Sequence, residues 1–77
     1  MFGYELFHRV TMLGDGCFMV STIGPSPYLP ETMIFDERDG RAYYCEHHSN
    51  ADDLNECHED VVRRFSAGEI ILADEQV

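Results

Sequence analysis

The stretch SNADDLNECHEDVVRRF, residues 49–65, decides the fold, because it carries the clearest helical pattern in the chain. After Leu54, apolar residues recur at the spacing that places them on one face of a helix. Ser49 or Asn50 can cap the start of this helix, and Gly68 follows its expected end. The predicted apolar stripe consists of Ala51, Leu54, Val61, Val62 and Phe65, with Cys57 and His58 between them. This pattern is typical of a helix that lies on a sheet.

Four runs of β-branched and aromatic residues before this helix predict strands. The predicted strands cover residues 4–12, 17–23, 32–35 and 42–46. The first two flank Gly14-Asp15-Gly16 and the last two flank an acidic turn that ends at Asp39-Gly40, so we expect two hairpins. Three prolines make the segment 24–30 an ordered loop rather than a strand. Residues 70–72 form either a short edge strand or an apolar strap.

The order of these elements predicts an α+β fold: an antiparallel sheet of about four strands with one helix packed on one face. With 77 residues the chain has room for one domain, which we expect to span residues 1–77. The N-terminal residues lack the basic and apolar regions of a signal peptide, and no apolar run is long enough to cross a membrane. Cys17, Cys45 and Cys57 are odd in number and irregularly spaced, so we expect reduced thiols in a cytoplasm.

The charge of the chain limits the kinds of molecule that it can bind. Fifteen acidic residues stand against five arginines and no lysine, which gives a net charge of −10. So acidic a small protein repels nucleic acids and anionic membrane surfaces. We therefore expect no direct contact with nucleic acid or membrane, and a protein partner whose own nucleic-acid-binding groove is basic.

Most of this charge falls in the second half of the chain, and on the predicted helix it avoids the apolar stripe. The helical acids are Asp52, Asp53, Glu56, Glu59 and Asp60. A second patch consists of Asp36, Glu37 and Asp39. We predict that these residues bind the partner, with Tyr44 as an exposed aromatic contact beside them. The alternative is that the acids form an ordinary solvated surface.

One cluster of side chains has the chemistry of metal ligands, namely Cys45, His47, His48, Cys57 and His58. Its spacing does not match the loops that close structural zinc sites, so we expect no metal and no other cofactor. We expect Cys57 and His58 in the core, with one His58 nitrogen hydrogen-bonded, and His47 and His48 exposed. The side chains of Cys57 and His58 diverge on a helix, and no other pair has the spacing of a nucleophile and its base, so we expect no enzymatic activity.

Three motifs resemble a recurring pattern in small phage and prophage proteins of unknown function. They are Glu31-Thr32-Met33-Ile34-Phe35 after a Val20-Ser21-Thr22 strand, the helix start Ser49-Asn50-Ala51-Asp52-Asp53, and His58-Glu59-Asp60-Val61. The resemblance covers roughly residues 20 to 65 and implies a phage origin, hence action in the host cytoplasm. In size and charge the chain is also similar to anti-CRISPR proteins, several of which imitate DNA.

These observations lead to two hypotheses. The first is a phage-encoded anti-CRISPR protein that binds a type I CRISPR effector (Cascade) through an acidic, DNA-mimicking surface and blocks target DNA binding. The second is a phage accessory or structural protein that contacts another protein through an apolar loop containing Tyr28 and Leu29, with the charge serving solubility only.

Overall fold

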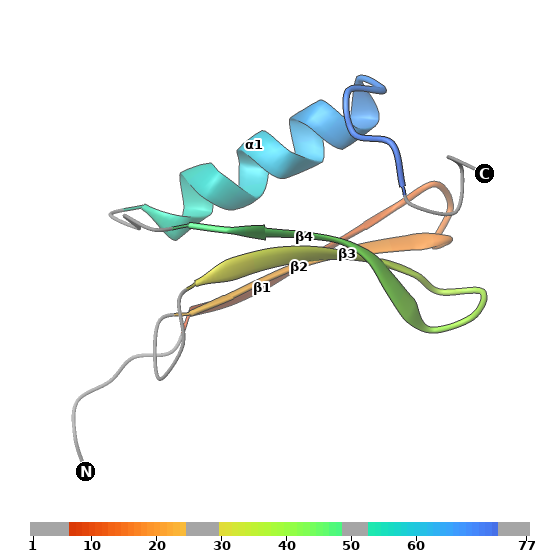
Figure 1. Cartoon of the computed structure of the whole chain (residues 1–77), viewed down its shortest axis with the longest axis horizontal. Coiled ribbons are helices and arrows are strands. Elements are labelled where there is room, and N and C mark those ends of the chain that lie inside the picture. Colours follow the sequence, from red (N-terminus) through yellow and green to blue (C-terminus); the bar gives the residue numbers. More distant parts are fainter. Residues whose placement is uncertain (1–6, 25–29, 49–52, 73–77) are drawn as a thin grey trace, which may run out of the picture.

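The computed structural model describes residues 7–24, 30–48 and 53–72, and within these ranges the chain forms one four-stranded antiparallel sheet and one helix (Figure 1). The strands are β1 (Phe7–Leu13), β2 (Phe18–Gly24), β3 (Glu31–Asp36) and β4 (Arg41–His47). Helix α1 (Leu54–Ser66) lies across one face of the sheet. The strand order is β1-β2-β3-β4, so each strand pairs with its neighbour in sequence. The predicted α+β fold is confirmed.

The first hairpin turns at Gly14-Asp15-Gly16, as the sequence predicts. All three residues have positive φ, between 57° and 88°, a region that glycine and aspartate reach at low cost. The amides of Gly16 and Cys17 donate to the carbonyls of Leu13 and Gly14, which closes the turn. Strands β3 and β4 each extend one residue beyond both predicted ends, and β2 lies one residue later than predicted. Tyr4, Glu5 and Leu6, the predicted start of β1, lie outside the described residues.

The two faces of the sheet differ in burial because side chains alternate along each strand. Val20 and Ile34 point toward α1 and are fully buried. On the opposite face, Val10, Met12 and Ile23 are 43 %, 48 % and 45 % exposed. No described element covers this second face, which we call the open face.

The core lies between the sheet and α1. Its buried hydrophobic residues are Val20, Ile34, Val61, Ile70 and Leu72. Phe65 of α1 meets Phe18 of β2 edge to face, with ring centroids 5.3 Å apart. Segment 70–72 is the apolar strap, because Ile70 and Leu72 are buried while no strand pairing forms there; the edge-strand alternative was wrong.

Helix α1 begins later than the sequence suggested. Its N-cap is Asp53, whose carboxylate accepts from the Glu56 amide at 3.2 Å. The predicted caps Ser49 and Asn50, and also Ala51 of the stripe, lie outside the described residues. The helix closes with the Ala67 amide on the Arg63 carbonyl, followed by Gly68 as predicted. None of the described helices is long and apolar enough to span a bilayer.

Candidate functional site

The predicted acidic strip follows the exposed side of α1, but its members have different surroundings. Glu56 and Glu59 are exposed, and Arg9 of β1 donates to Glu59 at 3.1 Å. Asp53 is exposed as well, although one of its carboxylate oxygens serves as the helix cap. Asp52 lies outside the described residues. The N-cap and the first turns of α1 therefore present three carboxylates to solvent, and Arg9 lies beside one of them.

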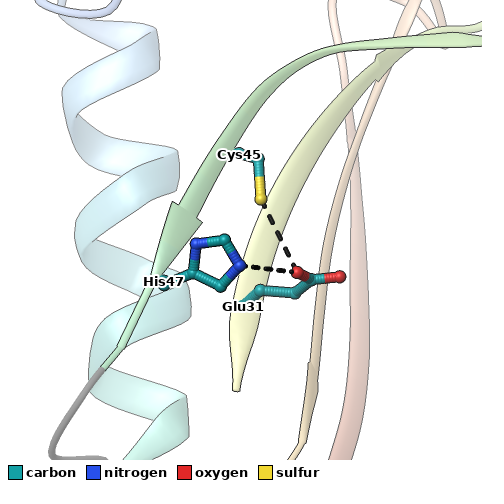
Figure 2. Close-up of side chains that lie close together, drawn as sticks. All are labelled: Glu31, Cys45 and His47. Atoms are coloured by element: carbon teal, nitrogen blue, oxygen red, sulfur yellow. Dashed lines mark hydrogen bonds and ion pairs between the residues drawn. The ribbon is translucent and has the colours of Figure 1, made fainter. Parts of the chain in front are cut away.

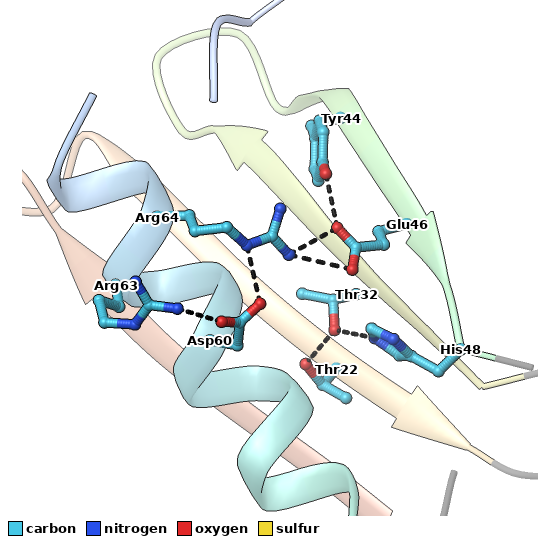
Figure 3. Close-up of polar contacts among 8 residues, drawn as sticks. All are labelled: Thr22, Thr32, Tyr44, Glu46, His48, Asp60, Arg63 and Arg64. Carbon is cyan, nitrogen blue, oxygen red and sulfur yellow. Dashed lines mark hydrogen bonds and ion pairs between the residues drawn. The ribbon is translucent and has the colours of Figure 1, made fainter. Parts of the chain in front are cut away.

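The next acid, Asp60, is tied into a network at the C-terminal half of α1 (Figure 3). It binds Arg63 and also Arg64, whose Nε donates at 2.7 Å. The same Arg64 guanidinium donates to both Glu46 oxygens, at 2.8 and 3.0 Å, and so joins α1 to β4. Asp60 therefore has two cationic partners, of which Arg64 is shared with Glu46, and its charge is largely compensated.

Tyr44 belongs to this network rather than to an exposed contact surface. Its ring is half-buried against the core, and its hydroxyl donates to Glu46 at 2.6 Å. Burial and the neighbouring Glu46 carboxylate raise the pKa of Tyr44. Burial alone would raise the pKa of Glu46, but the Tyr44 hydroxyl and the Arg64 guanidinium hold it below its ordinary value. Tyr44, which we predicted to be an exposed aromatic contact, therefore belongs to the network that links β4 to α1.

The three acids of the second predicted patch lie in or beside the turn between β3 and β4, and among the described residues only Asp36 is paired with an arginine side chain there. Asp36 is buried, and the Arg38 guanidinium donates to both of its carboxylate oxygens, at 2.9 and 2.8 Å. These hydrogen bonds lower the pKa of the Asp36 carboxyl. Asp39 accepts from the Arg41 amide and the Tyr43 hydroxyl. Glu37 is exposed.

A chain of hydrogen bonds runs through the interface between α1 and the sheet, and the sequence did not predict it. The Thr11 hydroxyl lies 2.7 Å from His58 Nε2, and His58 Nδ1 lies 2.7 Å from the Thr22 hydroxyl. The chain continues to Thr32 at 2.6 Å and from there to His48 Nε2 at 2.8 Å (Figure 3). His58 is fully buried as expected, with both nitrogens bonded; His48 is buried too, so its predicted exposure was wrong.

The hydrogen bonds from Thr11 to His48 can all form in either of two directions. If Thr11 donates to His58, each later hydroxyl donates to the next group and the chain ends on an accepting His48 nitrogen. If His48 donates instead, every bond reverses and His58 donates to Thr11. In both arrangements His58 donates through one ring nitrogen and accepts through the other, so its buried hydrogen bonds are satisfied by the neutral ring.

The stability of the protein should depend on pH through His58. Burial, aided by Arg9, lowers the pKa of His58 below its ordinary value near 6.5. The unfolded chain then binds a proton more readily than the folded one, so the free energy of unfolding is highest above about pH 6.5 and falls as the pH drops toward the folded pKa. We expect urea titrations between about pH 7.5 and about pH 5 to show a slope of up to about 1.4 kcal/mol per pH unit. His8→Gln, at an exposed site on β1, should keep this slope, and an unchanged stability over that range would contradict the assignment.

The predicted metal-ligand cluster is divided between the two faces of the sheet. His48 and His58 belong to the buried chain, and Cys57 is half-buried on α1. Cys45 and His47 lie two residues apart on β4 and point to the open face, where Glu31 of β3 joins them (Figure 2). A Glu31 oxygen lies 3.6 Å from Cys45 Sγ and 3.2 Å from His47 Nε2. Burial and the Glu31 carboxylate raise the pKa of the Cys45 thiol.

The structure thus places three of the predicted contact acids, Asp53, Glu56 and Glu59, on an exposed surface at the start of α1, with Glu59 paired to Arg9. Asp36 and Asp60 are tied into ion pairs with arginines. It also brings together Glu31, Cys45 and His47, a group that the sequence analysis did not assemble. Comparison of the chain with protein-family models, with curated proteins and with solved structures finds no match.

Proposed function

We propose that this protein is a non-catalytic phage inhibitor that occupies the basic nucleic-acid-binding groove of a host protein, and that a type I CRISPR effector complex is the target. The observation that carries the proposal is the exposed side of the first two turns of α1. There Asp53, Glu56 and Glu59 repeat every three residues, about 4.5 Å apart along the helix axis.

Charge and rigidity support this surface as the binding element. The net charge of −10 accelerates encounter with a basic groove and disfavours binding to nucleic acid itself. The helix is fixed to the sheet by the Arg64–Glu46 bridge and by the buried His58, so its carboxylates are held in place before binding. A pre-organised surface loses less conformational entropy on association.

The test is displacement of target DNA from a purified type I effector complex. We expect the protein to compete with DNA, and Glu56→Lys/Glu59→Lys to weaken competition by about tenfold or more, because two attractive contacts become repulsive. The matched control is Asp15→Lys/Glu69→Lys, which makes the same change in net charge at exposed positions outside α1 and outside both predicted acidic patches. The control should compete nearly as well as the unmodified protein.

Three outcomes would contradict the proposal or a part of it. Equal weakening by both double variants would mean that net charge, not the surface of α1, governs binding. Competition that does not weaken as salt rises would exclude an electrostatic mechanism. Failure to bind the effector at all would remove the type I complex as the target.

A second candidate function follows from the open face. Val10, Met12 and Ile23 form an apolar surface on the side of the sheet away from α1, and such surfaces mark protein contacts. An accessory protein of the virion would use this face, whereas the loop residues Tyr28 and Leu29 lie outside the described part of the chain. Under this alternative, Met12→Asp abolishes association with the virion protein and the α1 double variant does not.

A further inference from the structure

Glu31, Cys45 and His47 form a compact group of three different donors on the open face (Figure 2). Glu31 is the register partner of His47, and Met33, two residues further along β3, is the partner of Cys45. Side chains on paired strands that point to one face are near neighbours, so the pairing of β3 with β4 itself assembles the group. The three ligand atoms all lie within 4.8 Å of one another.

Two distances within the group match the edges of a coordination tetrahedron. Zinc binds imidazole nitrogen and carboxylate oxygen at about 2.1 Å and thiolate sulfur at about 2.3 Å. At a tetrahedral angle, these bond lengths separate nitrogen from oxygen by about 3.4 Å and sulfur from oxygen by about 3.6 Å. The structure has His47 Nε2 at 3.2 Å and Cys45 Sγ at 3.6 Å from the same Glu31 oxygen. Two edges of the group thus already have the length that a tetrahedral zinc site requires, and the third, between Cys45 Sγ and His47 Nε2, is at most 4.8 Å.

We propose that Glu31, Cys45 and His47 bind a zinc ion, or a metal ion of similar preference, on the open face of the sheet. One thiolate, one imidazole and one carboxylate suit a borderline-soft cation, whereas Ca²⁺ and Mg²⁺ prefer oxygen donors alone. Three protein ligands leave the fourth position of a tetrahedron to water or to an outside group. Because Cys45 and His47 are exposed, that fourth position faces solvent.

Titration of the full chain with Co²⁺ tests the site directly. Cobalt adopts the geometry of zinc and gives a thiolate charge-transfer band together with intense visible bands when it is tetrahedral. The protein should carry no affinity tag and should be kept reduced by a phosphine that does not compete for metal. We expect saturable absorption at one cobalt per chain, displaced by Zn²⁺, and a higher melting temperature with Zn²⁺ than without it.

Variants locate the site. Cys45→Ser should abolish the charge-transfer band, and His47→Gln and Glu31→Gln should each weaken cobalt binding by at least about tenfold. These side chains lie on the surface, so circular dichroism should show unchanged folding. Cys57→Ser and His8→Gln are the matched controls, because they remove a thiol and an imidazole elsewhere in the chain, and both should bind cobalt normally.

The proposal fails if no thiolate band develops, if the band persists in Cys45→Ser, or if Cys57→Ser removes it instead. A band that survives in both His47→Gln and Glu31→Gln with unchanged affinity also overturns it, because a lone thiol would then explain the signal. Inhibition of an effector complex does not depend on this site, so the two proposals fail independently.

Discussion

Replacing His58 with alanine should lower the free energy of unfolding by about 3 to 5 kcal/mol. The imidazole is fully buried between α1 and the sheet, so its loss leaves a cavity. Its removal also takes away the partner of two hydroxyls, those of Thr11 and Thr22. A single core in so small a domain supplies about 3–5 kcal/mol, so the variant should be largely unfolded in water at room temperature.

Urea denaturation followed by circular dichroism measures this loss. Where His58→Ala is unfolded without urea, a stabilising osmolyte should restore its helical signal and give the midpoint by extrapolation. His58→Gln keeps a hydrogen-bonding amide and should lose less than His58→Ala. The surface control is His8→Ala, which should stay within about 0.5 kcal/mol of the unmodified protein. A loss below about 1 kcal/mol in His58→Ala would show that the buried chain of hydrogen bonds contributes little.

Gly24→Ala should be the second most damaging substitution, with a loss of about 2 to 4 kcal/mol. Gly24 ends β2 with φ of 148°, a conformation that side chains strongly disfavour. A Cβ atom at this position would lie 2.6 Å from the Pro30 Cβ and 2.7 Å from its Cα. Pro30 cannot move away freely, because its carbonyl accepts from the His48 amide at 2.8 Å.

Gly40→Ala separates the cost of the backbone conformation from the cost of the contact with Pro30. Gly40 also has positive φ, at 74°, but an added Cβ there meets nothing within 4 Å. This control should lose only the cost of a left-handed backbone, about 1 kcal/mol. Urea denaturation of both variants compares them directly. Equal losses at Gly24 and Gly40 would mean that the contact with Pro30 is relieved without cost.

The fold followed from local signals, which explains why its main features were predictable. Gly14-Asp15-Gly16 specified a turn through backbone preference alone, and the stripe from Leu54 to Phe65 specified the buried side of α1. The start of α1 was misplaced because several capping residues precede Leu54, and spacing alone does not choose among them. His48 was assigned to the surface because its burial depends on a Thr32 hydroxyl from a different strand.

The candidate site was harder to predict, since ion pairs depend on which elements face each other. Glu59 and Asp60 are adjacent in sequence, yet Arg9 of β1 binds one, and two arginines of α1 bind the other. The Glu31 group required the register of β3 against β4, because Glu31 and Cys45 are 14 residues apart. One feature of the sequence could have indicated the buried chain of hydrogen bonds. Thr22 and Thr32 lie on neighbouring predicted strands, and His58 lies in the apolar stripe of the helix that packs on them.

The strand order determines the order in which parts of the protein can fold during synthesis. Each strand pairs with the one synthesised just before it, so the sheet assembles from contacts of short sequence separation, which form rapidly. The covering elements come last, because α1 and then Leu72 follow all four strands along the chain. On the ribosome, Val20 and Ile34 therefore stay uncovered until α1 has emerged, and the strap completes their burial afterwards. The apolar interior is therefore completed last, and before α1 emerges the nascent sheet is exposed on both faces to chaperones and to other nascent chains.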